Sequence, residues 1–219
     1  HTRSDRDWSS DVCSSDLSLL LDDLHDRAQL GEKDREMLTK AMAEIERMER
    51  LISALLTFAA PPRSRFAPGD PGEAAEDLVM LMQRPCQRQG VSLSLERNPL
   101  PTCLIDAEKI RQALLNLLKN ALEALPLGGT IRITVNHDEY DALISVHDSG
   151  HGIPGQDLPL IFEPFFTRKG AGTGLGLSIT RQIIEEHGGS INVSSAADQG
   201  STFLIRLPLL LPDSETVSA

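Results

Sequence analysis

The 219-residue chain is poor in several features, and each scarcity argues against a class of protein. It has three cysteines, Cys13, Cys86 and Cys103, which form no CxxC pair and leave an odd count, so a disulfide framework is excluded and a reducing cytosol is favoured. No apolar run approaches the roughly 20 residues of a membrane helix. Basic residues number 21 against 32 acidic ones, and this net charge of -11 argues against a general nucleic-acid-binding protein.

The first seventeen residues show neither helical nor strand periodicity and are rich in Ser and Asp. The stretch from Asp7 to Leu17, DWSSDVCSSDL, resembles the in-frame translation of a common sequencing adapter. We therefore expect residues 1–17 to be a non-native leader that should be excluded from reasoning about the fold. The native sequence would begin near Ser18, and an upstream sensor or membrane segment would be missing.

Residues 18–60 predict a helical hairpin. A short apolar-periodic segment over 17–30 ends at Gly31, and a longer helix is expected over 32–60, where two prolines stop it. Within one chain, only the short helix over 17–30 is available to cover the apolar seam of the long helix. We therefore expect a homodimer, in which two hairpins form a four-helix bundle. The alternative is a stalk that packs on its own domain. The seam alternates steps of three and four residues: Leu38, Ala41, Ile45, Met48, Ile52, Leu55 and Ala59.

A linker rich in Pro and Gly is expected over 61–72, followed by one α+β domain over 73–208 and a tail over 209–219. Helices are predicted over 74–89, 106–125 and 173–187, with Asp106 as a good N-cap for the second. Alternating strands are predicted over 91–95, 130–135, 142–148, 191–195 and 201–208, with a short one over 102–105. Mixed strands with helices on one face predict a two-layer sandwich of a mixed or antiparallel sheet.

The stretch from Asp148 to Leu177 is the most informative part of the sequence. Asp148 precedes Gly150 and Gly152, and a second glycine run over 170–176 opens a helix. Glycine permits positive φ and close backbone approach, and a helix N-terminus after such a loop is a ready anion site. We interpret the stretch as a nucleotide site that holds the base at Asp148 and the phosphates at the second loop.

Asn116 and Asn120 lie one turn apart on the predicted helix 106–125, opposite its apolar face. Asn is unfavourable inside a helix because its amide competes with the backbone, so two in register need a reason. Taken alone, the pair is compatible with a solvated helix face.

Four blocks therefore stand in a fixed order: Asn116 to Ala121, Asp148 to Gly152, Phe162 to Lys169, and Gly170 to Leu177. Over residues 65–207 this order resembles the catalytic, ATP-binding domain of the sensor histidine kinases, within the GHKL ATPase superfamily (the Bergerat-type fold). Residues 18–60 resemble the second half of the dimerisation and phosphoacceptor domain of that family.

The resemblance implies ATP and Mg²⁺ as cofactors. Asp148 would accept a hydrogen bond from the adenine amino group, Thr202 would lie behind the adenine pocket, and Asn120 would ligate Mg²⁺, whose ligands are oxygens. Asn120 and Lys169 would be the catalytic residues. The remaining residues expected to bind ATP are Asn116, Gly150, Gly152, Ile153, Thr167, Arg168, Gly172, Thr173, Gly174, Leu175, Gly176 and Leu177.

Hydrolytic members of the superfamily carry a water-activating Glu four residues before the magnesium-binding Asn, and Asn116 stands at that position here. Without this base, phosphoryl transfer is favoured over hydrolysis. The resemblance implies a cytoplasmic kinase that transfers the γ-phosphate of ATP to a histidine. The phosphoryl group would then pass to the receiver domain of a response regulator. A GHKL-type ATPase and a non-enzymatic, ATP-gated dimerisation module remain alternatives.

The phosphoacceptor block of the family is a His, an acid, a polar pair and a Pro. His25 is followed by Asp26, but no Pro follows, and His25 lies only six residues from the Gly31 turn. We therefore expect no phosphoacceptor in this chain and place it upstream of Ser18. The fragment is predicted to bind Mg·ATP without phosphorylating itself.

Overall fold

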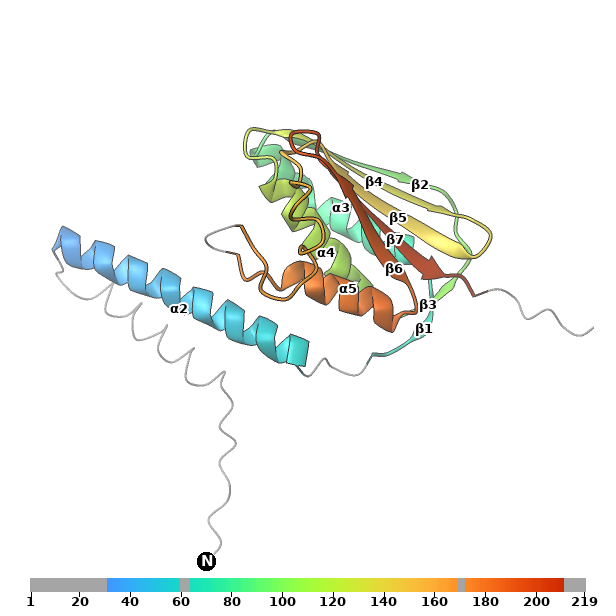
Figure 1. The fold of residues 1–219 in the computed structure, drawn as a ribbon, viewed down its shortest axis with the longest axis horizontal. Helices are drawn as coiled ribbons and strands as arrows, with labels where there is room; N and C mark the ends of the chain where they lie inside the picture. Colours follow the sequence, from blue (N-terminus) through green and yellow to red (C-terminus); the bar gives the residue numbers. More distant parts are fainter. Residues whose placement is uncertain (1–30, 60–63, 169–171, 211–219) are drawn as a thin grey trace, which may run out of the picture. The chain divides into compact units, whose positions relative to one another are not determined.

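The computed structural model describes residues 31–59, 64–168 and 172–210 (Figure 1). The chain divides into two compact units, residues 1–61 and 62–219. The predicted leader and the short helix over 17–30 lie outside the described residues, as do His25 and the tail beyond 210.

Helix α2 (Glu32–Ala59) is the described element of the first unit, and it agrees with the long helix predicted from the heptad seam. Two seam residues, Met48 and Ile52, are about half exposed, at 49% and 51%. Leu38 and Ile45 are partly buried. The seam therefore offers apolar surface that is not covered within the described part of the chain. Among the described helices, none combines the length and apolar character needed to cross a bilayer.

The second unit is built on a five-stranded mixed sheet. The β2–β4 pair is parallel, and the other three pairs are antiparallel. A separate two-stranded antiparallel sheet pairs β1 (Ala67–Gly69) with β3 (Cys103–Ile105). The order across the large sheet is β2 (Val91–Arg97), β4 (Gly129–His137), β5 (Asp141–Asp148), β7 (Ser201–Pro208) and β6 (Ser190–Ser195).

Helices α3 (Pro71–Arg88), α4 (Ala107–Glu123) and α5 (Gly176–Glu186) all cover the same face of this sheet (Figure 1). Alternate strand residues are buried beneath them, as the period of two requires. The predicted α+β two-layer sandwich is thus confirmed. The buried strand residues include Ile131, Ile133, Val135, Ala142, Ile144, Val146, Phe203, Ile205 and Leu207.

Two helices begin elsewhere than the sequence suggested. Helix α3 begins at Pro71, inside the predicted linker, because Asp70 caps it by accepting a 2.7 Å hydrogen bond from the Gly72 amide. Helix α5 begins at Gly176 rather than Thr173, because Gly174 has a φ of +69° that no right-handed helix accommodates.

Residues at the start of the predicted tail belong to the domain. The Leu209 amide donates to the Tyr140 carbonyl at 2.8 Å, and the Leu210 amide donates to the Thr102 carbonyl at 2.7 Å. These bonds extend pairing past the predicted domain end at 208.

Candidate nucleotide-binding site

Asp148 ends strand β5 on the face that the helices cover, and it is 3% exposed. Its Oδ1 accepts a 2.8 Å hydrogen bond from the Gly150 amide. Burial raises the pKa of this carboxyl above its ordinary value, although the Gly150 and Ser201 backbones and the nearby His147 and His151 oppose the rise. Among the described residues, no Lys or Arg forms an ion pair with Asp148.

Gly150 and Gly152 follow Asp148 in a loop with no space for side chains. A Cβ on Gly150 would lie 2.5 Å from the Ala124 carbonyl oxygen, and one on Gly152, whose φ is +66°, would lie 1.9 Å from the Ala196 carbonyl oxygen. The close approach seen here is therefore to the protein's own backbone. It fixes the Asp148 loop between the end of α4 and the β6–β7 turn.

Asn116 and Asn120 both lie on α4 and are partly buried. The Asn116 amide donates to the Gly176 carbonyl at 3.2 Å and lies 3.5 Å from the Thr180 hydroxyl. The predicted asparagine face therefore meets the first turn of α5, which brings together two of the four sequence blocks. Within the described part of the chain, the Asn120 amide has no hydrogen-bond partner.

Gly174, in the described part of the second glycine run, lies against the backbone of Phe165. A Cβ on Gly174 would lie 2.4 Å from the Phe165 carbonyl carbon, and Phe165 itself has a φ of +67°. Leu175 is fully buried, and its amide donates to the Thr173 hydroxyl at 3.3 Å. These contacts set the path of the chain into α5. The other loop residues named above, Gly172, Gly176 and Leu177, are partly exposed, and Lys169 lies outside the described residues.

Arg168 does not point freely toward a ligand. Its guanidinium binds both carboxylate oxygens of Asp157, at 2.6 and 3.1 Å, and this hydrogen bonding raises the pKa of Arg168 above its ordinary value. Asp157 is 3% exposed, so a buried carboxylate holds an arginine whose side chain remains 68% exposed. The ion pair joins Asp157, which precedes the Phe162–Lys169 block, to Arg168 near the end of that block. Thr167, next to Arg168, is exposed.

Thr202, predicted to lie behind the adenine pocket, faces away from Asp148. Thr202 pairs with His147 across the sheet, and its hydroxyl lies 3.0 Å from His147 Nδ1 on the face away from the helices. Ser201 is the register partner of Asp148 and is 5% exposed on the helix-covered face. Successive strand residues point to opposite faces of the sheet, so Ser201 lies on the same face as Asp148 and Thr202 lies on the opposite face.

Ser195 is a second residue that sequence reasoning missed. Its hydroxyl accepts from the Ile153 amide at 2.8 Å and lies 2.7 Å from the Gly200 carbonyl and 3.1 Å from the Ser201 hydroxyl. It therefore joins the end of the Asp148 loop to β7. The period of two along β5 and β7 could have identified Ser201, whereas no local pattern marks Ser195 or Asp157.

Comparison with known proteins places this geometry in a family. The family model described as histidine kinase-, DNA gyrase B- and HSP90-like ATPase matches residues 105–211. The catalytic domain of histidine kinase ThkA, in a nucleotide-free form, is 35% identical with a TM-score of 0.61, and the match covers 66% of this chain and 97% of that domain. The chain belongs to the sensor histidine kinase family.

Three longer histidine kinases extend the likeness. Sensor histidine kinase ZraS of Escherichia coli (strain K12) is 34% identical over 185 residues, covering 84% of this chain. Full-length ShkA in complex with AMPPNP has a TM-score of 0.71 at 26% identity over 90% of this chain. ThkA in complex with the response regulator TrrA has a TM-score of 0.67 at 27% identity, also over 90%. The chain spans 40% of ZraS and 45% of ShkA.

Proposed function

We propose that this chain is the catalytic fragment of a sensor histidine kinase that binds Mg·ATP and transfers its γ-phosphate to a histidine. The observation that carries the proposal is the buried Asp148 carboxylate, which has no cationic partner among the described residues. A buried carboxylate of this kind is costly to the fold. An adenine amino group would supply the donor that compensates it, and would select adenine over guanine.

Asn120 is the residue proposed to hold Mg²⁺. Its amide lies on α4 next to the Asn116 turn, is partly buried, and has no protein partner in the described part of the chain. Mg²⁺ takes oxygen ligands and usually keeps phosphate and water oxygens in its shell, so a single amide oxygen suits it. The ion would neutralise phosphate charge, together with Lys169 in the proposed catalytic role.

Transfer is favoured over hydrolysis by the residue at position 116. The Asn116 amide cannot act as a general base, and it is already engaged with the Gly176 carbonyl. Catalysis would then rest on positioning and on charge neutralisation, with an external histidine as acceptor. The ATPase alternative would need a water-activating carboxylate at that position.

Two partners follow from the proposal. The half-exposed seam of α2 is suited to a second copy of this chain, because heptad surfaces are buried by pairing. The likeness to ThkA in complex with TrrA supports a response-regulator receiver domain as the second partner. We retain the cytoplasm as the proposed location, where ATP is available and the free Cys86 and Cys103 stay reduced.

The test uses γ-labelled ATP with the chain as it stands. We expect saturable, Mg²⁺-dependent ATP binding, no steady release of phosphate and no acid-labile phosphohistidine on the fragment. Steady phosphate release without an acceptor would instead support the ATPase. Phosphohistidine on the isolated chain would contradict the missing acceptor and implicate His25. The absence of ATP binding would support the non-enzymatic dimerisation module.

A further inference from the structure

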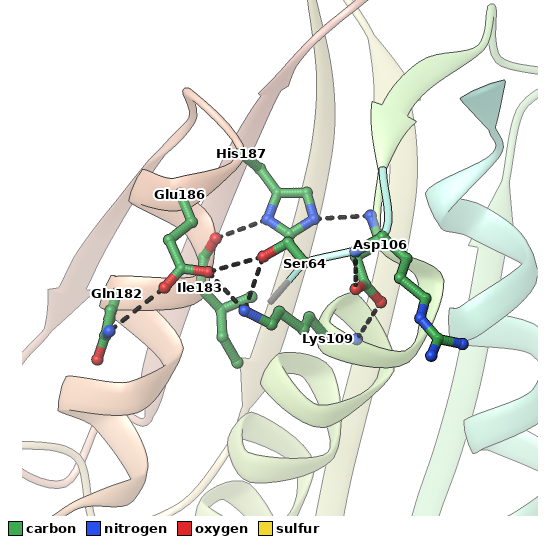
Figure 2. A network of polar contacts seen from close by, with 8 residues as sticks. Ser64, Asp106, Lys109, Gln182, Ile183, Glu186 and His187 are labelled. Carbon is green, nitrogen blue, oxygen red and sulfur yellow. Dashed lines mark hydrogen bonds and ion pairs between the residues drawn. The ribbon is translucent and has the colours of Figure 1, made fainter. Parts of the chain in front are cut away.

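A polar cluster outside the nucleotide site joins the beginning of α4 to the end of α5 (Figure 2). The Lys109 ammonium lies 2.7 Å from Glu186 Oε2 and 2.7 Å from the Ser64 hydroxyl. The Lys109 side chain is 10% exposed and that of Glu186 is 28% exposed. Burial opposes ionisation of Glu186, but hydrogen bonds and the charge of Lys109 lower the pKa of this carboxyl overall.

His187 completes the cluster with a single possible arrangement of its proton. Its Nδ1 lies 2.7 Å from the Ile183 carbonyl, which can only accept, and its Nε2 lies 2.9 Å from the Asp106 amide, which can only donate (Figure 2). His187 is therefore neutral with the proton on Nδ1. It is 7% exposed, so this bridge between α5 and the start of α4 is sheltered from solvent.

Three consecutive residues of the segment that follows α2 rest on this cluster. The Ser64 hydroxyl lies 3.1 Å from Glu186, and the Arg65 amide donates to Asp106 Oδ2 at 2.7 Å. The Phe66 ring packs edge-on against His187 with the centroids 5.0 Å apart. Phe66 nevertheless remains 43% exposed, and Arg65 is exposed. The segment is thus held at the surface by a few specific contacts.

We infer that Lys109, Glu186, His187 and Asp106 form a docking site for Ser64–Phe66. This site would set the length of the tether, the stretch of chain between Ala59 and the first residue held by the second unit. Five residue steps separate Ala59, the last residue of α2, from Ser64. At about 3.6 Å per residue, the end of α2 then stays within about 18 Å of the docked segment. If Ser64–Phe66 leaves, eight steps separate Ala59 from Ala67 of β1, and the reach becomes about 29 Å.

The tether length matters if the proposed function holds, because the ATP site must reach a histidine on the dimerisation helices and afterwards withdraw. Lys109 and Glu186 are positioning residues in this scheme, since neither lies at the nucleotide site. Docking favours a short reach, and release permits a long one. The same α4 and α5 carry Asn116 and Gly176, so the tether is anchored to the helices that frame the ATP site.

The experiment measures a distance distribution by pulsed electron resonance. Spin labels are placed at the exposed Ala43→Cys of α2 and Ser92→Cys of β2, with Cys13 replaced by Ser and an excess of unlabelled chain to suppress signals between copies. Lys109→Met is expected to broaden the distribution and extend its long edge by up to about 11 Å, the difference between the two reaches. Ser64→Ala combined with Phe66→Ala should do the same from the linker side, without altering either helix.

The matched control is Lys40→Met, which removes a lysine from the exposed Lys40–Glu36 pair of α2 and should leave the distribution unchanged. Lys109→Arg keeps the charge and should restore a narrow distribution. Unchanged distributions in both the Lys109→Met and the linker-side variants, with their thermal unfolding and ATP affinity intact, would overturn the inference. Failure of the unsubstituted chain to bind ATP would contradict the proposed function and leave the distance result standing.

Discussion

At the scale of one residue, Asp148 is unfavourable for folding, because its carboxyl is buried, but is suited to binding a nucleotide base. The carboxylate is buried, its pKa is raised chiefly by burial, and no cation pairs with it among the described residues. A residue selected for stability alone would be neutral there. Its retention is explained if an adenine amino group completes its hydrogen bonds when nucleotide binds.

The substitution Asp148→Asn separates these two effects. Asn keeps an oxygen for the Gly150 amide but offers an NH₂ group where the adenine amino group would donate. We expect Mg·ATP affinity to fall by at least about tenfold, because two donors that face each other cost more than about 1.4 kcal/mol of binding free energy. Thermal stability should stay level or rise. Asp141→Asn, at the other end of β5, is the control and should leave ATP affinity unchanged. Wild-type affinity in Asp148→Asn would contradict the role of Asp148.

The raised pKa of Asp148 also predicts a pH dependence of folding stability. Its folded-state pKa lies above the unfolded value of 3.8, so its contribution is present in full below 3.8 and is lost as pH rises through the folded-state pKa. Glu186 and Asp106 have lowered pKa values and lose stability in the opposite direction, as pH falls. The free energies of unfolding in urea of the unsubstituted chain and of Asp148→Asn should therefore diverge as pH rises above 3.8, with Asp148→Asn becoming the more stable of the two. A constant difference across this range would contradict the assignment.

The residues that sequence reasoning placed correctly are those whose role depends on local spacing. Asn116 and Asn120 were predicted on one helix face from a separation of four, and Asp148 was predicted at a strand end. Ser201 was not predicted beside Asp148 because its position depends on strand register, which the sequence leaves open by one residue. Asp157 was missed because its partner Arg168 lies eleven residues away in a segment without regular periodicity.

At the scale of elements, the loop before α5 is shaped by a contact that permits only glycine. Gly174 has a φ of +69° and has no room for a Cβ above Phe165. The predicted helix began three residues too early, at Thr173, because the helical pattern of the sequence extends back past Gly174 whereas the φ of Gly174 does not allow helix there. The contact with Phe165 also fixes the chain that leads to the N-terminus of α5, where the proposed phosphate contacts lie.

The variant Gly174→Ala tests this loop. Alanine would be strained at this φ and would displace the loop from Phe165, so ATP affinity is expected to fall by at least about tenfold, with a stability loss of about 1 to 3 kcal/mol. Gly155→Ala is the matched control, because nothing lies within 4 Å of a Cβ at that position. Equal ATP affinities of the two variants by titration would show that the path of the loop does not govern binding.

The element order of the second unit was largely predictable, because alternating strands and capped helices carry their signals within ten to twenty residues. Asp106 caps α4 as predicted, by accepting from the Lys109 amide at 3.2 Å. The β1 strand was not predicted, because its three residues, Ala67–Gly69, lie in a sequence rich in Pro and Gly and are ordered by pairing with β3. Short strands of this kind are specified by their partners rather than by their own pattern.

At the scale of the whole molecule, the α2 seam predicts self-association. Replacing Ile52, which is 51% exposed in the single chain, by Glu should convert a dimer into a monomer, because the charge would be buried in the paired seam. Ala43→Glu lies on the exposed side of the helix off the seam and is the control. Sedimentation equilibrium measures the mass. A monomeric unsubstituted chain at tens of micromolar would contradict the pairing.

The central claim is that this chain binds Mg·ATP at Asp148 and the α4–α5 face. Isothermal titration of the unsubstituted 219-residue chain with ATP and Mg²⁺ tests it most directly. The account predicts saturable binding of one nucleotide per chain, weakened when Mg²⁺ is removed and weaker still for GTP. A chain shown to be folded by its cooperative thermal transition, yet giving no binding heat with Mg·ATP at any of several temperatures, would contradict the account.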